Sequence, residues 1–320
     1  MSPWQRADYR SVDVRVRGGL LRAGIWGPEP GPEGPAGPTV LAVHGVTASH
    51  VAWGLLADEL PGVRLVAPDL RGRGRSNALP GPFGMAAHAD DLAAVLAAHG
   101  IGTAGTGHGR GGAVVVGHSM GAFAALVLAH RYPQLVRRLV LVDGGLPLQV
   151  PAGLSADEVV AAVLGPAAER LSRQFPSREA YRLFWREHPA FELHWNPLVE
   201  AYVDYDLDGE GHQLRPSTSY QAVAQDTVDL NGGGELLAAL AHLSVPALLL
   251  RSPRGLLNEP QGLYRPEYVR EWTAKTRLLT ARDVPDTNHY SILMDHPGVE
   301  AVAGAVREAL EPQLSHPSGR

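Results

Sequence analysis

The sequence predicts an α/β fold in which a mostly parallel sheet carries helices on both faces and a helical cap is inserted. Apolar, strand-like runs alternate with helix-like stretches along most of the 320 residues. This alternation lapses between about 145 and 240, where the chain is helical in pattern, and then resumes. A Gly-x-Ser-x-Gly motif lies between a strand-like run and a helix-like stretch. We therefore expect an α/β core at 1–144 and 241–320, and a helical cap insertion at 145–240.

The composition narrows the class of protein. An apolar content of 45% is ample for a buried core, and a net charge of −5 gives no general attraction to nucleic acid or acidic membranes. The chain has no cysteine, which excludes disulfides and thiolate metal sites and fits a reducing compartment. The N-terminus lacks the apolar core of a signal peptide, and the longest apolar stretch, 113–129, contains Gly117, His118 and Ser119. We expect a cytoplasmic protein without membrane insertion or a nucleic-acid partner.

The N-terminal region predicts a hairpin followed by a loop. Residues 11–17 alternate with a period of two, residues 20–26 are weakly strand-like, and Gly18-Gly19 joins them. Residues 27–38 are nearly all Gly and Pro without a three-residue glycine repeat, which is typical of a surface loop. Residues 102–112 are also glycine-rich. Because that loop precedes a strand, it is a linker and not a phosphate-binding loop.

The remaining elements follow from apolar runs and helical spacing. Strands are expected at Thr39–Val43, Val63–Ala67, Arg138–Val142, Val245–Leu250 and Arg277–Val284, and helices at Val51–Leu60, Met85–His99, Tyr264–Lys275 and Pro297–Leu310. Their alternation requires crossover connections, so the sheet is expected to be mostly parallel.

The stretch from Ala113 to Pro133 predicts a sharp strand-to-helix turn. The apolar run Ala113–Val116 meets Gly117-His118-Ser119-Met120-Gly121, and helical apolar spacing follows up to Pro133. In such a turn the central residue is strained, and glycines two residues to either side avoid clashes. The strain presents the Ser119 hydroxyl at the edge of the sheet. The Met120 amide, at the start of the helix, faces the same space and can bind a developing oxyanion.

With these motifs the chain resembles the α/β-hydrolase superfamily. The resemblance rests, in order, on His44-Gly45, the Asp69-to-Ser76 segment, the Gly117-to-Gly121 turn and Asn288-His289-Tyr290. It covers nearly the whole chain outside the insertion. It implies an α/β-hydrolase fold with an eight-stranded sheet, a cap inserted after the sixth strand, and no cofactor or metal.

The resemblance also implies roles for individual residues. Ser119 matches the nucleophile, and His289, which follows it in the chain as the family requires, matches the base. The second oxyanion-hole donor is then the Val46 amide, beside that of Met120. His44 is expected to be structural. His118 is expected to pack or hydrogen-bond beside the nucleophile, at the border of the substrate pocket.

The acid of the triad is the residue that the sequence leaves open. Many family members carry it after the seventh strand in an Arg-Gly-x-x-Asp loop, but here Gly255 stands where aspartate is expected. Asn258 carries no charge, and Glu259 is a nearby candidate. Asp143 directly follows the sixth strand, as in the similar thioesterase domains of polyketide synthases. We favour Asp143, with Glu259 as the alternative acid.

The insertion is rich in aromatic residues, which suggests a substrate with an apolar part. It holds nine of the twenty Phe, Trp and Tyr residues of the chain. Trp185 and Trp195 are candidates for the pocket wall, although such rings also serve simply to pack a cap onto a core. The expected function is a serine hydrolase acting on carboxylic esters, lactones or thioesters. A haloperoxidase or C–C bond hydrolase with the same triad, and a non-catalytic ligand-binding protein, are the alternatives.

Overall fold

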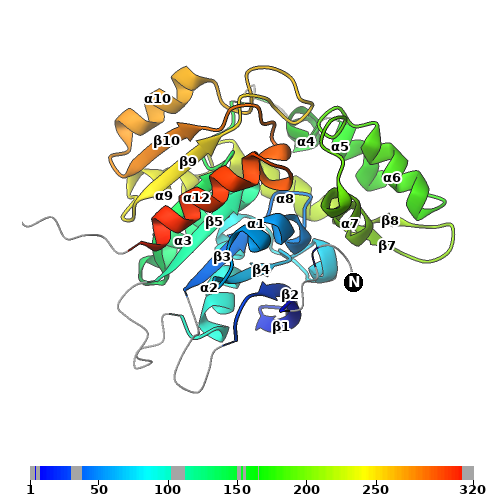
Figure 1. Ribbon diagram of the computed structural model, residues 1–320, viewed down its shortest axis with the longest axis horizontal. Coiled ribbons are helices and arrows are strands. Elements are labelled where there is room, and N and C mark those ends of the chain that lie inside the picture. Colours follow the sequence, from blue (N-terminus) through cyan, green and yellow to red (C-terminus); the bar gives the residue numbers. More distant parts are fainter. Residues whose placement is uncertain are drawn as a thin grey trace, which may run out of the picture.

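The computed structural model describes residues 4, 8–29, 38–101, 112–149, 153, 156–164 and 166–311 (Figure 1). Most of the two glycine-rich segments predicted as loops, at 27–38 and 102–112, lies outside these ranges. Within them, every helix is too short or too polar to span a lipid bilayer.

Eight of the described strands build one sheet in the order β1-β2-β4-β3-β5-β6-β9-β10. The strands are β1 (Arg10–Val16), β2 (Gly19–Trp26), β3 (Thr39–Val43), β4 (Arg64–Pro68), β5 (Ala113–His118), β6 (Val136–Val142), β9 (Ala247–Arg251) and β10 (Leu279–Asp283). β2 pairs antiparallel with β1 and β4, and the other pairs are parallel. The predicted α/β-hydrolase fold with a mostly parallel eight-stranded sheet is confirmed.

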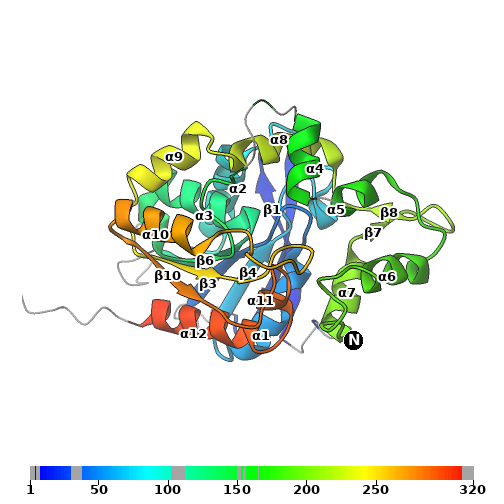
Figure 2. The same ribbon diagram turned by 90° about the horizontal axis from the view of Figure 1, so that it is seen from above.

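Helices cover both faces of the sheet (Figure 2). The helices that flank it are α1 (Gly54–Glu59), α2 (Met85–Ala98), α3 (Met120–Arg131), α9 (Gly234–Ala241), α10 (Pro266–Lys275), α11 (Ser291–Met294) and α12 (Gly298–Leu310). The two-residue period of a strand divides the core between the faces. In β3, Leu41 and Val43 pack with the apolar residues of α2 and α3, whereas Val40 and Ala42 pack with those of α1 and α12.

The insertion after β6 contributes helices and a small second sheet. It contains α4 (Ala156–Leu164), α5 (Pro166–Glu169), α6 (Arg178–Arg186), α7 (Pro197–Tyr205), β7 (Leu207–Asp208), β8 (Arg215–Pro216) and α8 (Tyr220–Leu230). In both views α6, α7 and the β7–β8 pair stand together to one side of the large sheet (Figures 1 and 2). The following helix, α9, packs against α2 and α3 of the core.

Parallel pairing brings the candidate residues to one edge of the sheet. His118, the last residue of β5, lies opposite Val142, the last residue of β6. Val142 in turn lies opposite Leu250 of β9. The residues that directly follow these strands, Ser119 and Asp143 among them, therefore leave the sheet side by side.

Candidate active site

Ser119 occupies a strained turn between β5 and α3. Its backbone has φ 53° and ψ −126°, a region that residues other than glycine rarely adopt. The turn is tight because a Cβ at Gly117 would lie 2.4 Å from the Gly121 oxygen, and one at Gly121 would lie 2.0 Å from the Val43 oxygen. The Ser119 amide donates to the Val142 carbonyl at 2.9 Å. Ser119 is partly exposed, whereas its neighbours His118 and Met120 are buried.

His289 is paired with a buried carboxylate. Its Nδ1 lies 2.7 Å from Oδ2 of Asp143, whose side chain is fully buried. The other carboxylate oxygen, Oδ1, accepts from the Ser252 amide at 3.1 Å, which fixes the direction of the carboxylate. Because a carboxylate accepts, Nδ1 carries the proton, and Nε2 is left free to take one from a hydroxyl.

Local turns place both members of this pair. Asp143 has φ 44°, and its amide donates to the Leu250 carbonyl at 2.7 Å, so the chain turns sharply at the end of β6. The Asn288 side-chain oxygen accepts from the amides of Tyr290 and Ser291 at 2.9 and 2.8 Å. This turn starts α11 and holds His289 between two anchored neighbours.

Glu259, the alternative acid, lies in a loop that closes on itself. Its Oε2 accepts from the Leu257 amide at 2.8 Å, and the residue is exposed. A Cβ at Gly255 would lie 1.9 Å from Glu259 Oε1, so the glycine leaves room for this carboxylate inside its own loop. The structure thus brings Asp143, and not Glu259, to the imidazole.

The loop after β3 lies over the serine. A Cβ at Gly45 would be 3.1 Å from Ser119 Cβ and 3.6 Å from Ser119 Oγ. His44 Nε2 accepts from the Leu70 amide at 2.9 Å, so its Nδ1 carries the proton and donates to the Gly45 carbonyl at 2.7 Å. Burial lowers the pKa of His44 to about 4 and keeps the ring neutral. This bond holds the peptide whose amide belongs to Val46. The sequence analysis predicted a structural role for His44 but could not identify its hydrogen bonds to Leu70 and Gly45.

His118 supports the backbone of His289. Its Nε2 donates to the His289 carbonyl at 2.8 Å, and the two rings have centroids 4.8 Å apart. Burial first, and then the neighbouring His289 and His44, lower the pKa of His118 to about 3. The His118 ring is therefore neutral in the folded protein at neutral pH. A direct contact of His118 with substrate stays a prediction.

This neutral histidine has a consequence for acid stability. Below pH 6.5 the unfolded chain binds a proton at position 118 that the folded protein does not bind, so His118 lowers the free energy of unfolding as the pH falls. We expect His118→Gln, which keeps an N–H donor, to reduce the slope of that free energy between pH 6 and pH 4.5 by about 1 kcal/mol per pH unit. Urea unfolding at several pH values measures the slope. An unchanged slope would show that position 118 exchanges its proton equally in both states.

Trp185 and Trp195 lie in the insertion but differ in burial. Trp185 is 1% exposed and packs against Phe191 and Tyr290, with the Arg170 guanidinium 4.9 Å from its ring. Trp195 is half-buried, with the Arg186 guanidinium 4.9 Å from its ring. Trp185 therefore reaches the residue next to His289. A role of either ring in the substrate pocket stays a prediction.

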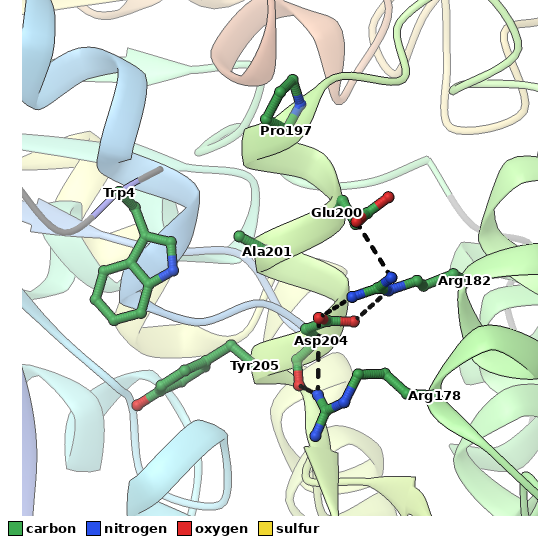
Figure 3. Close-up of a pocket in the computed structure, with 8 residues that line it drawn as sticks. All are labelled: Trp4, Arg178, Arg182, Pro197, Glu200, Ala201, Asp204 and Tyr205. Atoms are coloured by element: carbon green, nitrogen blue, oxygen red, sulfur yellow. Dashed lines mark hydrogen bonds and ion pairs between the residues drawn. The ribbon is translucent and has the colours of Figure 1, made fainter. Parts of the chain in front are cut away.

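A separate cavity lies between the N-terminal segment and the insertion (Figure 3). It has a volume of about 400 Å³ and is lined by Trp4, Arg178, Arg182, Pro197, Glu200, Ala201, Asp204 and Tyr205. Figure 3 shows that its charged side chains pair with one another, for instance Arg182 with Asp204 at 2.5 Å. Its lining includes none of the residues of the candidate active site.

Two curated proteins are similar to this chain over different shares of its length. The chain is 41% identical over 134 residues to the lipase LipV of Mycobacterium tuberculosis, an alignment that spans 42% of this chain and 46% of the lipase, less than half of that relative. It is 28% identical over 258 residues to the 2-(acetamidomethylene)succinate hydrolase of Mesorhizobium japonicum, spanning 80% of this chain and 82% of that enzyme.

Solved structures share the fold over nearly the full length. A crystal structure of E-2-(acetamidomethylene)succinate hydrolase superimposes with a TM-score of 0.75 at 22% identity. The superposition covers 95% of this chain and 100% of that enzyme's chain. A thioesterase domain from the curacin biosynthetic pathway gives a TM-score of 0.69 at 21% identity, covering 94% of this chain and 99% of that domain. At these identities the likeness shows the fold alone.

The model of the α/β-hydrolase fold family matches residues 38–228, more than half of the 320 residues. The matched range contains the loop after β3, the turn at Ser119 and Asp143. The chain belongs to the α/β-hydrolase fold family.

Proposed function

We propose that this protein is a serine hydrolase that cleaves carboxylic ester, lactone or thioester bonds through an acyl-enzyme on Ser119. The observation that carries the proposal is the 2.7 Å contact between His289 Nδ1 and the buried Asp143 carboxylate, at the sheet edge where Ser119 stands in its strained turn. A serine hydroxyl is a poor nucleophile by itself, and a histidine oriented by a carboxylate is the base that activates it.

The reaction follows from these positions. Ser119 Oγ attacks the acyl carbonyl while His289 Nε2 takes its proton, and the Asp143 carboxylate stabilises the imidazolium. The amides of Val46 and Met120 stabilise the oxyanion of the tetrahedral intermediate. When the intermediate collapses, His289 returns the proton to the leaving oxygen or sulfur, and the acyl group stays on Ser119. Water activated by His289 then attacks the acyl-enzyme, and the acid and free serine are released.

The names of the relatives support hydrolysis of an acyl bond, since they include a lipase and a thioesterase domain. The nine aromatic residues of the insertion support a small-molecule substrate with an apolar part. In this proposal residues 145–240 act as the cap that shapes specificity, with Trp185 and Trp195 as candidate pocket residues beside His118. The chemistry needs no cofactor and no metal.

Burst kinetics test this proposal. Mixing the protein with p-nitrophenyl acetate, p-nitrophenyl octanoate and a matching octanoyl thioester is expected to give turnover, with an initial burst of leaving group equal to the protein concentration where deacylation is slower. The same-triad alternatives give different products. Cleavage of a β-diketone without ester turnover would indicate a C–C bond hydrolase. Halogenation of an acceptor in the presence of peroxide and bromide, without ester turnover, would indicate a haloperoxidase.

A further inference from the structure

Two buried arginines hold consecutive carbonyls of the loop over Ser119. Arg73 Nε donates to the Val46 carbonyl at 2.8 Å, and Arg170 Nη2 donates to the Thr47 carbonyl at 3.2 Å. Both arginine side chains have no exposed surface. Arg73 lies in the loop after β4, whereas Arg170 follows α5 in the insertion. Two elements far apart in the sequence thus fix the same short segment.

Arg73 contacts both residues whose amides we assign to the oxyanion hole. Besides the Val46 carbonyl, its guanidinium reaches Met120 Sδ at 3.8 Å from Nη2. Its Nη1 also donates to the Arg71 carbonyl at 3.0 Å. The guanidinium thus contacts two backbone carbonyls and one side-chain sulfur. A guanidinium is a planar fork of donors, and each bond restricts the position of the others.

Each arginine is neutralised by an aspartate of the insertion. Asp226 of α8 lies 2.5 Å from Arg73 Nη1, and its Oδ1 accepts from the Gly84 amide. Asp206, directly after α7, lies 2.7 Å from Arg170 Nη1. A buried arginine without such a partner would be costly, so the position of each guanidinium depends on its aspartate.

We propose that Arg73 and Arg170 are positioning residues for the oxyanion hole, and that Asp226 and Asp206 tie this hole to the insertion. The inference rests on the proposed function. In a planar peptide the N–H of one residue is fixed together with the C=O of the residue before it, so the Val46 amide is oriented with the Gly45 carbonyl, which accepts from His44 Nδ1 at 2.7 Å. The arginines hold the next two carbonyls, those of Val46 and Thr47, so the peptides on both sides of Val46 are anchored and its amide keeps one direction before substrate arrives. Preorganised donors stabilise an oxyanion far better than donors that must first reorient.

A third buried arginine–aspartate pair provides a matched control. Arg71 donates to Asp91 through Nε and Nη2, at 2.6 and 2.7 Å, and its side chain is 1% exposed. Its other bonds go to the carbonyls of Pro80 and Arg17 and not to the loop over Ser119. Replacing Arg71 therefore removes a guanidinium that is as buried as that of Arg73 but has no contact with the proposed oxyanion hole.

The test compares Arg73→Lys, Arg170→Lys and Arg71→Lys in the full chain. Lysine keeps the charge and loses the fork. We expect Arg73→Lys to lower kcat for p-nitrophenyl acetate about 10²-fold, with KM within twofold of wild type, since loss of one oxyanion donor costs about 10²- to 10³-fold. The affinity for an alkyl boronic acid, which mimics the tetrahedral intermediate, should fall by the same factor. Arg170→Lys should show the same split, and Arg71→Lys should change kcat less than threefold.

Thermal unfolding of the three variants separates positioning from stability. Equal losses of kcat in Arg73→Lys and Arg71→Lys at similar Tm, or a change in KM alone, would overturn the proposal. If Arg73→Lys does not fold, Arg170→Lys decides it, because it acts on the neighbouring carbonyl. A wild-type protein that hydrolyses none of the esters would instead overturn the proposed function itself, before any variant is compared.

Discussion

Ser119→Ala is expected to lower the turnover of every ester substrate by about 10⁴-fold or more, down to the rate that binding and the oxyanion hole alone provide. The loss is large because no other group replaces the attacking oxygen. The fold should persist, since the bonds that shape the turn come from the backbone, such as the Ser119 amide to the Val142 carbonyl. Stopped-flow turnover of p-nitrophenyl acetate together with thermal unfolding measures both quantities.

Ser172→Ala is the matched control for this substitution. Ser172 is exposed, and its hydroxyl donates to the Glu169 carbonyl at 2.9 Å in the insertion. This variant should keep wild-type turnover. Turnover of Ser119→Ala within tenfold of the control would contradict an acyl-enzyme on Ser119.

Asp143→Asn is expected to lower kcat on the order of 10⁴-fold with the fold intact. The amide can still accept the Ser252 N–H through its oxygen, but its NH₂ group presents a donor to His289 Nδ1. The imidazole then carries its proton on Nε2 and cannot accept one from Ser119, which is the known cost of the wrong tautomer. Because an imidazole with its proton on Nε2 cannot act as base, KM should change much less than kcat.

Glu259→Gln is the matched control, because it makes the same carboxylate-to-amide change at the alternative acid. We expect it to change kcat less than threefold, since Glu259 accepts from the Leu257 amide within its own loop. Steady-state kinetics of both variants on one ester provide the comparison. The reverse order of effects would assign the acid to Glu259 and leave the Ser119–His289 pair in place.

Much of the fold could be predicted because local patterns determine it. The alternation in residues 11–17 and the glycines at 18 and 19 predicted the hairpin that appears as β1 and β2. The spacing of Gly117 and Gly121 around Ser119 predicted the tight turn, because a Cβ at either glycine would overlap backbone oxygens. Deviations occur at element ends. The helix expected at Val51–Leu60, for example, begins as a 3₁₀ turn at His50–Trp53 before α1.

Other features depend on contacts that no local pattern carries. β7 and β8 have two residues each, too few for a strand period to show in the sequence. The choice between Asp143 and Glu259 depends on how the loop at 253–260 closes. Arg170 and the Thr47 carbonyl are 123 positions apart, so their hydrogen bond is a product of the tertiary fold. The sequence alone does not distinguish a buried arginine from an exposed one, because burial depends on the tertiary contacts of its guanidinium.

The most direct test of the acyl-enzyme mechanism is peptide mapping by mass spectrometry after reaction with a small fluorophosphonate. An activated serine attacks phosphorus and displaces fluoride, which leaves a stable phosphonate ester on its oxygen. The mechanism predicts one adduct per chain, located on Ser119, with loss of ester turnover in step with labelling and no adduct in Ser119→Ala. An adduct on another serine, or a protein that turns over esters while Ser119 stays unlabelled, would contradict it.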